Sequence, residues 1–232
     1  MQTIGVLGGI GPQATMEFER LLHRASQELV PPSAMEGYPP LVVHYCRFPP
    51  FVADGTGAPV LPRRPDPRLL EAASKLGALV DFLVVTSNAT HLFQRDIESA
   101  SGKEVLGVVE LVLAEVGRRG WQRVGVVGFG DPVVYTGPLA EFGFASETPG
   151  AELQAPLDRA IQRVMEGRVE EADEQVAHAV ISELRTRSVD GIVLGCTEIP
   201  PLLGDAAADP DLIDPLPLLA EAAVRRALEA PS

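Results

Sequence analysis

The sequence has few cysteines, few aromatic residues and few basic residues for its length of 232. Its two cysteines, Cys46 and Cys196, are too few for the disulfide framework of a small secreted protein, so we expect a cytoplasmic, reducing environment. Nineteen Lys and Arg against thirty-two Asp and Glu give a formal net charge of −13, which argues against binding nucleic acid or anionic membranes. No apolar run approaches the roughly 18 residues of a membrane-spanning helix. The run from Ile4 ends at Gly8 and Gly9, too early for a signal peptide.

Helical and strand-like stretches alternate along the chain. Short apolar runs predict strands at 4–7, 41–43, 82–85, 124–127 and 192–194. Amphipathic stretches predict helices at 13–30, 69–79, 110–117, 151–167, 170–187 and 216–229. A loop rich in proline and glycine is expected at 49–67. Because strands that alternate with helices form parallel sheets, the sequence predicts the α/β class.

An internal repeat divides the chain into two halves. The segment IGVLG at 4–8 is echoed by VGVVG at 124–128, and DFLVVTS at 81–87 by DGIVLGC at 190–196. The members of each pair are about 110 to 120 residues apart. A repeat of this length indicates two similar structural units. We therefore predict two pseudo-symmetric domains with parallel sheets, of the Rossmann-like or flavodoxin-like type.

The first domain is expected at 1–105 plus 207–232, and the second at 106–206. Ligands of open parallel sheets bind beyond the carboxyl ends of the strands. Ser87 and Cys196 stand at such ends, one in each half. Each alone is equally well explained as a small residue that closes a strand, but their symmetry-related positions favour a function. We expect them on opposite sides of an active-site cleft between the domains.

Four motifs carry a family resemblance: GGIGPQAT at 8–15, SNATH at 87–91, GCTE at 195–198 and LIDP at 212–215. They resemble GGMGPxAT, CNTAH, GCTE and LIDP of the aspartate/glutamate racemase superfamily, in the same order and spacing and over essentially the whole chain. The resemblance implies an isomerase of amino-acid metabolism that needs no pyridoxal phosphate or other cofactor, acts on a small carboxylate or amino acid, and forms a homodimer. In the racemases of this superfamily two cysteines flank the substrate's α-carbon, one removing a proton and the other returning one.

The first of these cysteine positions is occupied by Ser87 and the second by Cys196. A thiol has an unperturbed pKa of about 8.5, so it serves as base in one half-reaction and as acid in the next. A serine hydroxyl ionises several units higher and is a poor carbon base unless another group activates it. Cys196 is therefore the expected main acid/base, Ser87 is a weaker catalytic candidate, and the symmetric pair of thiols is lost.

The expected substrate pocket also departs from the family pattern. Family racemases that act on Asp or Glu place an Arg after the second strand, and the matching stretch here puts Phe51 at that position. Arg47 lies four residues earlier and is an alternative cationic contact. A family threonine is replaced by Phe129, and a second basic residue by Glu166. Because an apolar pocket cannot replace a bidentate Arg, we expect a substrate whose variable group is uncharged.

Turns after the strands supply backbone amides that suit an anion. We expect these amides to hold a carboxylate or enolate at helix N-termini. The substrate-binding candidates in these turns are Ile10, Gly11, Asn88, Ala89, Thr197 and Glu198. The glycine turn at 8–11 is not G-x-G-x-x-G, and no acidic residue follows at the place that would bind a ribose, so dinucleotide binding is disfavoured.

The remaining polar candidates keep two interpretations each. The four histidines show no metal-ligand spacing, so no metal site is expected. His91 either orients the Ser87 loop or packs in the core. Glu198 either tunes Cys196 or caps the turn that follows it. Cys46, on an apolar strand, is more typical of a small buried hydrophobic residue than of a nucleophile.

Two classes of function follow. The first is a cofactor-independent enzyme of the racemase or epimerase type, which transfers the α-proton of a non-acidic amino acid or small carboxylate with Cys196 as the main acid/base. The second is a repurposed member of the superfamily, such as a one-cysteine decarboxylase, another biosynthetic enzyme or a non-catalytic carboxylate binder. The retained GCTE motif favours the first class, whereas Ser87 and Phe51 favour an altered reaction or the second class.

Overall fold

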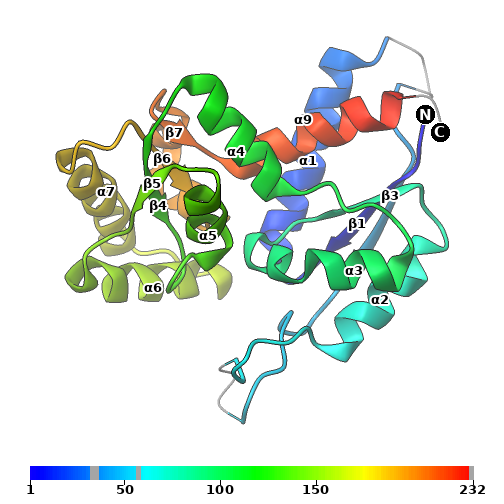
Figure 1. Ribbon diagram of the computed structural model, residues 1–232, viewed down its shortest axis with the longest axis horizontal. Helices are drawn as coiled ribbons and strands as arrows, with labels where there is room; N and C mark the ends of the chain where they lie inside the picture. Colours follow the sequence, from blue (N-terminus) through cyan, green and yellow to red (C-terminus); the bar gives the residue numbers. More distant parts are fainter. Residues whose placement is uncertain (32–36, 56–58, 230–232) are drawn as a thin grey trace. The chain divides into compact units, whose positions relative to one another are not determined.

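The computed structural model describes residues 1–31, 37–55 and 59–229, which fall into two compact units. The first unit contains Met1–Gly107 and Leu216–Ser232, and the second contains Val108–Pro215. Each unit has its own parallel sheet with helices around it (Figure 1), so the predicted α/β class with two sheets is confirmed. Residues 56–58 of the expected loop and 230–232 of the expected first domain lie outside the described residues.

The sheet of the first unit has three parallel strands in the order β2-β1-β3. They are β1 (Ile4–Gly8), β2 (Leu41–Tyr45) and β3 (Phe82–Val85). Beyond β3, an isolated parallel bridge joins Leu83 to Val105. The strands pair in register, so the residues that follow β1, β2 and β3 leave the sheet at the same edge.

Helices of the first unit begin where the sequence supplies helix-starting residues. Both α1 (Pro12–Leu29) and α2 (Pro67–Gly77) have proline in the first turn, and Asp66 caps α2 by accepting the N–H of Arg68. The other helices of the unit are η1 (Asn88–Phe93), α3 (Gln94–Ser101) and α9 (Pro215–Leu228). Buried side chains from β1, β3, α2 and α3 form its core, and Cys46 is completely buried among them.

The sheet of the second unit has four parallel strands in the order β5-β4-β6-β7. They are β4 (Arg123–Val127), β5 (Ala145–Glu147), β6 (Gly191–Leu194) and β7 (Leu212–Ile213). This order matches β2-β1-β3 plus the Val105 bridge, strand for strand. The internal repeat of the sequence therefore corresponds to a repeat of sheet topology, with β4 equivalent to β1 and β6 equivalent to β3.

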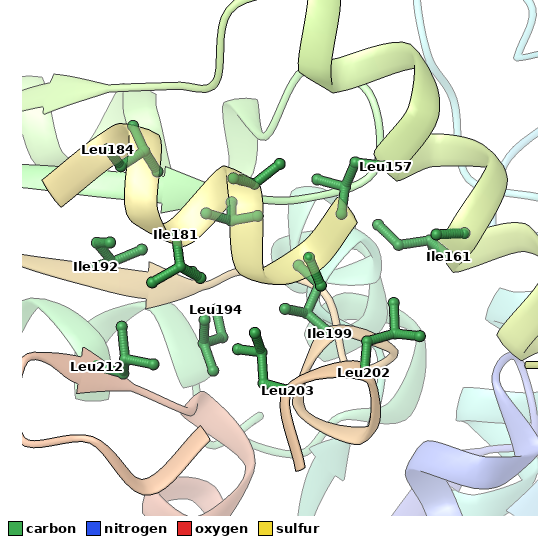
Figure 2. Close-up of a cluster of buried hydrophobic side chains, with 14 of the residues drawn as sticks. Leu157, Ile161, Ile181, Leu184, Ile192, Leu194, Ile199, Leu202, Leu203 and Leu212 are labelled. Atoms are coloured by element: carbon green, nitrogen blue, oxygen red, sulfur yellow. The ribbon is translucent and has the colours of Figure 1, made fainter. Parts of the chain in front are cut away.

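Six helices of the second unit surround this sheet in the described part of the chain. They are α4 (Val108–Arg119), α5 (Val133–Glu141), α6 (Ala151–Met165), α7 (Glu171–Thr186), α8 (Ile199–Leu203) and the 3-10 helix η2 (Gly204–Ala208). Figure 2 shows how Leu157 of α6, Ile181 of α7, Ile192 of β6 and Leu202 of α8 come together in one apolar cluster. Cys196, in the loop after β6, packs against this cluster.

The helices and strands expected from sequence patterns are all present, with bounds that shift by one or two residues in most cases. Seven elements were not expected: α3, α5, β5, α8, β7 and the two 3-10 helices η1 and η2. Within the described residues, no helix is both long and apolar enough to cross a membrane.

Candidate active site

The turn after β1 is shaped by close backbone contacts. Gly9 has a φ of +78°, and a Cβ there would come within 2.7 Å of Tyr45 Cα. The Gly9 N–H donates to Thr15 Oγ1 at 2.8 Å, and that hydroxyl also pairs with Thr86 Oγ1 at 2.8 Å. Both threonines are buried, so they tie the turn after β1 to the end of β3. Ile10 and Gly11 follow in this turn and are half-buried.

Ser87 directly follows β3 and Thr86, at the same edge of the first sheet. Its Oγ accepts a hydrogen bond from Thr90 Oγ1 at 2.9 Å, and its carbonyl lies 3.1 Å from His91 Nδ1. Because a carbonyl only accepts, Nδ1 carries the proton and Nε2 is unprotonated. Burial lowers the pKa of His91 to about 4, against backbone hydrogen bonds to Ser87 and Asn88 that favour the charged ring. The orienting interpretation of His91 is therefore favoured, with a neutral ring at physiological pH.

Two buried nitrogens beside Ser87 have no hydrogen-bond partner among the described residues. They are Asn88 Nδ2 and His91 Nε2, on side chains that are each more than nine-tenths buried. Nδ2 carries two donors, whereas the unprotonated Nε2 is an acceptor. Ala89, the next residue, is exposed. A buried donor without an acceptor is uncommon in folded proteins, so the Asn88 amide is suited to an acceptor supplied by a ligand.

Cys196 lies beyond β6, the equivalent of β3, in the second unit. Gly195 precedes it with its Cα so close to β4 that a Cβ would be 3.0 Å from the Val127 carbonyl oxygen. Cys196 Sγ donates to Glu198 Oε2 at 3.0 Å, and Thr197 Oγ1 donates to the same oxygen at 2.9 Å. The Glu198 side chain is buried and makes no capping hydrogen bond to α8, so the tuning interpretation of this residue is favoured.

The surroundings of Cys196 keep it protonated at neutral pH. Burial raises the pKa of the thiol well above its usual value, and the Glu198 carboxylate, which accepts the S–H, raises it further. Backbone hydrogen bonding by Glu198 and Phe129 acts in the opposite direction and lowers the pKa of the thiol. The site thus combines an adjacent proton acceptor with donors that stabilise a thiolate once the proton has left.

Tyr135 of α5 belongs to the same site and was missed by sequence reasoning. Its ring packs against the Cys196 loop, since a Cβ on Gly195 would be 3.2 Å from Tyr135 Cδ2. Its hydroxyl is completely buried and has no hydrogen-bond partner in the part of the chain that the structure describes. Burial raises the pKa of this hydroxyl, and the negative charges of Asp214 and Cys196 add to the effect. No pattern in the sequence distinguishes this tyrosine from an ordinary core residue.

The other sequence candidates are divided between the two units. Arg47 follows β2, is exposed, and holds its guanidinium 5.5 Å from the centre of the Tyr45 ring. Phe51 is half-buried against the core of the first unit. Burial raises the pKa of the Cys46 thiol to about 11, which fits a structural role for that residue. In the second unit, the Phe129 side chain is 53% exposed, and Glu166 forms an exposed ion pair with Arg168.

The chain belongs to the Asp/Glu/hydantoin racemase family, whose model matches residues 7–223. It is also similar to RacX of Bacillus subtilis (strain 168), a broad specificity amino-acid racemase. The two are 29% identical over 114 residues, which is 49% of this chain and 48% of RacX. The match therefore spans about half the length of this curated relative.

Solved structures of the family share the fold. A structure assigned as an Asp/Glu racemase from Yersinia pestis has a TM-score of 0.78 at 23% identity, and the match covers 99% of this chain and 100% of that one. An aspartate racemase homologue from Pyrococcus horikoshii OT3 has a TM-score of 0.75 at 21% identity, with 99% and 100% covered. The maleate isomerase Iso from Pseudomonas putida S16 is more distant, at 13% identity and a TM-score of 0.58 over 97% and 91% of the two chains.

Proposed function

We propose that the protein is a racemase- or epimerase-type enzyme that moves the α-proton of a small carboxylic acid or amino acid without pyridoxal phosphate. The observation that carries this proposal is the hydrogen bond from Cys196 Sγ to the buried Glu198 carboxylate, at a strand end of a chain in the racemase family. A thiol with a proton acceptor 3.0 Å away, and with backbone hydrogen bonding that favours its thiolate, has what a carbon acid/base needs.

The proton transfers can be written from these contacts. The S–H proton moves to Glu198 Oε2, which leaves a thiolate that backbone hydrogen bonding by Phe129 and Glu198 favours. The thiolate then takes the proton from the substrate's α-carbon, and the electron pair stays on the substrate as an enolate of its carboxylate. Once the S–H has exchanged its proton with solvent, return of that proton to the same face completes an exchange, and Glu198 then gives its proton back to the thiolate. In this scheme Cys196 supplies both steps on its own face.

Ser87 is the proposed group on the opposite face of the α-carbon, where the family places its first cysteine. Its hydroxyl accepts a hydrogen bond from Thr90, and no charged group is among its hydrogen-bond partners in the described chain. A hydroxyl in these surroundings is not activated as a base, so we propose that it delivers or removes a proton slowly. Each compact unit would then supply one catalytic residue, Ser87 from the first and Cys196 from the second.

The substrate's carboxylate is proposed to bind near the ends of β1 and β3. The amides of Ile10, Gly11 and Ala89 and the unpartnered Asn88 Nδ2 are the supporting donors. Phe51 and Phe129 favour a variable group that is uncharged. Free Asp and Glu would place their distal carboxylate without a bidentate partner, at a cost of several kcal/mol. We also propose a cytoplasmic homodimer, and light scattering after size-exclusion chromatography tests the dimer.

The test is a screen for α-hydrogen exchange in D₂O. Both enantiomers of apolar and acidic amino acids, and small α-substituted carboxylates, are incubated with the wild-type protein and followed by proton NMR. We expect exchange with an apolar substrate, little with Asp or Glu, and none with Cys196→Ala. Exchange that survives in the Cys196→Ala protein would overturn the assignment, and rapid exchange of Asp and Glu would overturn the proposed selectivity.

A one-cysteine decarboxylase is the second candidate, and the single thiol is the observation that favours it. An enzyme that protonates an enolate from one face needs only one acid, and the raised pKa of the Cys196 thiol favours its protonated form. Arylmalonate decarboxylase has the same fold, with a TM-score of 0.50 at 16% identity over 98% of this chain and 93% of that one. Release of CO₂ from substituted malonates, without α-hydrogen exchange of amino acids, would select this function. Protection of Cys196 from iodoacetamide by a carboxylate that is never turned over would select a binder.

A further inference from the structure

The loop between β4 and α5 is held by two polar side chains from α6. Gln154 Nε2 donates to the carbonyl oxygen of Gly128 at 2.9 Å, and the backbone N–H of Gly130 donates to Asp158 Oδ1 at 2.8 Å. Gln154 Nε2 also donates to Asp158 Oδ1 at 2.7 Å, so the two side chains brace each other. The residue between the two anchored glycines is Phe129.

Within this loop, residues 128–132, side chains do little to position the segment 128–130, although Pro132 is buried. Gly128 and Gly130 have no side chain, and the Phe129 side chain is 53% exposed. Gly130 has a φ of +59°, which favours glycine, and a Cβ on Gly128 would be 3.0 Å from Pro132 Cβ. The position of the loop therefore depends on its backbone contacts, and the anchors from α6 provide two of them.

The anchoring helix is itself firmly placed. Gln154 and Asp158 are four residues apart, so they lie on the same face of α6, one turn apart. Leu157 and Ile161 of the same helix are completely buried in the apolar cluster of the second unit (Figure 2). Because close-packed cores are hardly compressible, α6 has a fixed position and is a rigid support for the loop.

The anchored segment lies beside the thiol, because the N–H of Gly195, the residue before Cys196, donates to the carbonyl oxygen of Val127 at 2.6 Å, directly before the loop. Backbone hydrogen bonding by Phe129 also lowers the pKa of the Cys196 thiol. We propose that Gln154 and Asp158 are positioning residues that hold the Phe129 amide against the Cys196 sulfur and so stabilise its thiolate. The catalytic consequence rests on the proposed role of Cys196. We call the contacts of Gln154 and Asp158 with this loop the clamp. Its effect is measured as a change in the ionisation of the thiol, which needs no substrate.

Loss of the clamp has a specific sign. Without a fixed amide donor the thiolate is less stable, so the pKa of Cys196 rises, by about one unit for one hydrogen bond to an ion. The thiolate fraction then falls about tenfold, and the greater nucleophilicity of a more basic thiolate offsets part of this. We expect alkylation to slow by about three- to tenfold. The negative charge of Asp158 acts the other way, because removing it favours the thiolate.

The experiment uses the full chain with Cys46→Ala as background, so that Cys196 is the only thiol. Rates of alkylation by iodoacetamide are recorded from pH 7 to pH 11 for Gln154→Leu, Asp158→Ala and Asp158→Asn. Gln162→Leu is the matched control, because Gln162 lies on the same helix and its side chain donates to the exposed Glu166, at 3.3 Å. Circular dichroism and urea unfolding verify the fold of each variant.

For Gln154→Leu and Asp158→Ala we expect slower alkylation at neutral pH and a higher midpoint in the plot of alkylation rate against pH. Asp158→Asn keeps an oxygen acceptor for the Gly130 N–H, so it should stay within about twofold of the background or alkylate faster. Equal acceleration by Asp158→Ala and Asp158→Asn would show a charge effect alone and overturn the clamp. Equal rates for Gln154→Leu and Gln162→Leu would also overturn it. If the clamp variants shift the midpoint and the wild type exchanges no α-hydrogen, the clamp stands and the proposed function fails.

Discussion

In the first unit the residue beyond β3 is Ser87, and in the second the residue at the equivalent position beyond β6 is Cys196. Ser87 Oγ accepts from a neutral hydroxyl, that of Thr90, whereas Cys196 Sγ donates to the buried carboxylate of Glu198. The two sheets share their strand order, so the fold offers the same position twice. A repeated fold therefore provides symmetric positions, and the side chains at those positions decide whether the chemistry is symmetric.

The two units also differ in the hydrogen bonding of their buried hydroxyls. In the first unit Thr15 and Thr86 pair with each other, and Thr15 accepts the Gly9 N–H as well. In the second unit the Tyr135 hydroxyl is buried with no partner in the described residues. A satisfied hydroxyl stabilises the fold, whereas an unsatisfied one costs free energy. The threonine pair therefore stabilises a turn, whereas the Tyr135 hydroxyl lowers the free energy of unfolding at a position beside the thiol.

The largest expected effect is the difference between removing Cys196 and removing Ser87. Cys196→Ala should lower turnover by about 10²- to 10⁴-fold, the usual contribution of a general acid/base. Ser87→Ala should lower it by less, on the order of tenfold, because the hydroxyl is not activated. Steady-state rates on the substrate found in the D₂O screen give both numbers. Equal losses for the two variants would mean that the two faces are chemically equivalent.

Thr15→Val should destabilise the first unit by about 1–3 kcal/mol. The substitution keeps the shape of the side chain but leaves the Gly9 N–H and the Thr86 hydroxyl without their partner. Thr15→Ser keeps the oxygen and is the matched control. Free energies of unfolding from urea titrations measure the two variants. If Thr15→Val is no less stable than Thr15→Ser, the hydroxyl pair does not hold the turn.

Glu198→Gln should lower the pKa of Cys196 by about one unit, or 1.4 kcal/mol, because the negative charge beside the sulfur is removed while an acceptor for the S–H remains. The iodoacetamide rate at neutral pH should rise, since more of the thiol is ionised. In the Cys46→Ala background, the pH dependence of alkylation reports the shift. An unchanged or higher midpoint would show that Glu198 does not control the thiol.

The smallest expected effect is that of Tyr135→Phe. Because the hydroxyl has no partner among the described residues, its removal should change the free energy of unfolding by less than about 1 kcal/mol, or raise it. Tyr135→Leu, which also removes ring contacts with the Cys196 loop, should cost about 2–4 kcal/mol. Urea unfolding compares the two. A loss above about 2 kcal/mol for Tyr135→Phe would mean that the hydroxyl does have a partner.

Much of the fold follows from the sequence because its signals are local. The apolar runs at β1, β3, β4 and β6 predict buried parallel strands, and the repeat predicts the second sheet. Helix α5 was missed because Gly137 and Pro138 interrupt its pattern, and β5 because it has only three residues. Short elements of this kind are stabilised by tertiary packing, which leaves little periodicity to detect.

The strand-end positions of the candidate residues could be predicted from motifs, whereas residues brought beside them by packing could not, and the roles of all of them stay predictions. Ser87, Asn88, Cys196 and Glu198 lie in motifs at strand ends, and the structure places them there. Tyr135, Gln154 and Asp158 come from helices whose sequence is that of an ordinary core or solvated face. The contacts of these three with the Cys196 and Phe129 loops depend on how α5 and α6 pack, and no short-range pattern encodes that.

The most direct test of the central claim compares α-hydrogen exchange for the two enantiomers of one substrate in D₂O, in the wild type and in Ser87→Cys. With one competent thiol, the wild type should exchange one enantiomer about 100-fold or more faster than the other, with configuration retained in the first turnovers. Ser87→Cys should bring the two rates closer together. Equal and rapid exchange of both enantiomers by the wild type would contradict the account, because Ser87 would then be as good a base as Cys196.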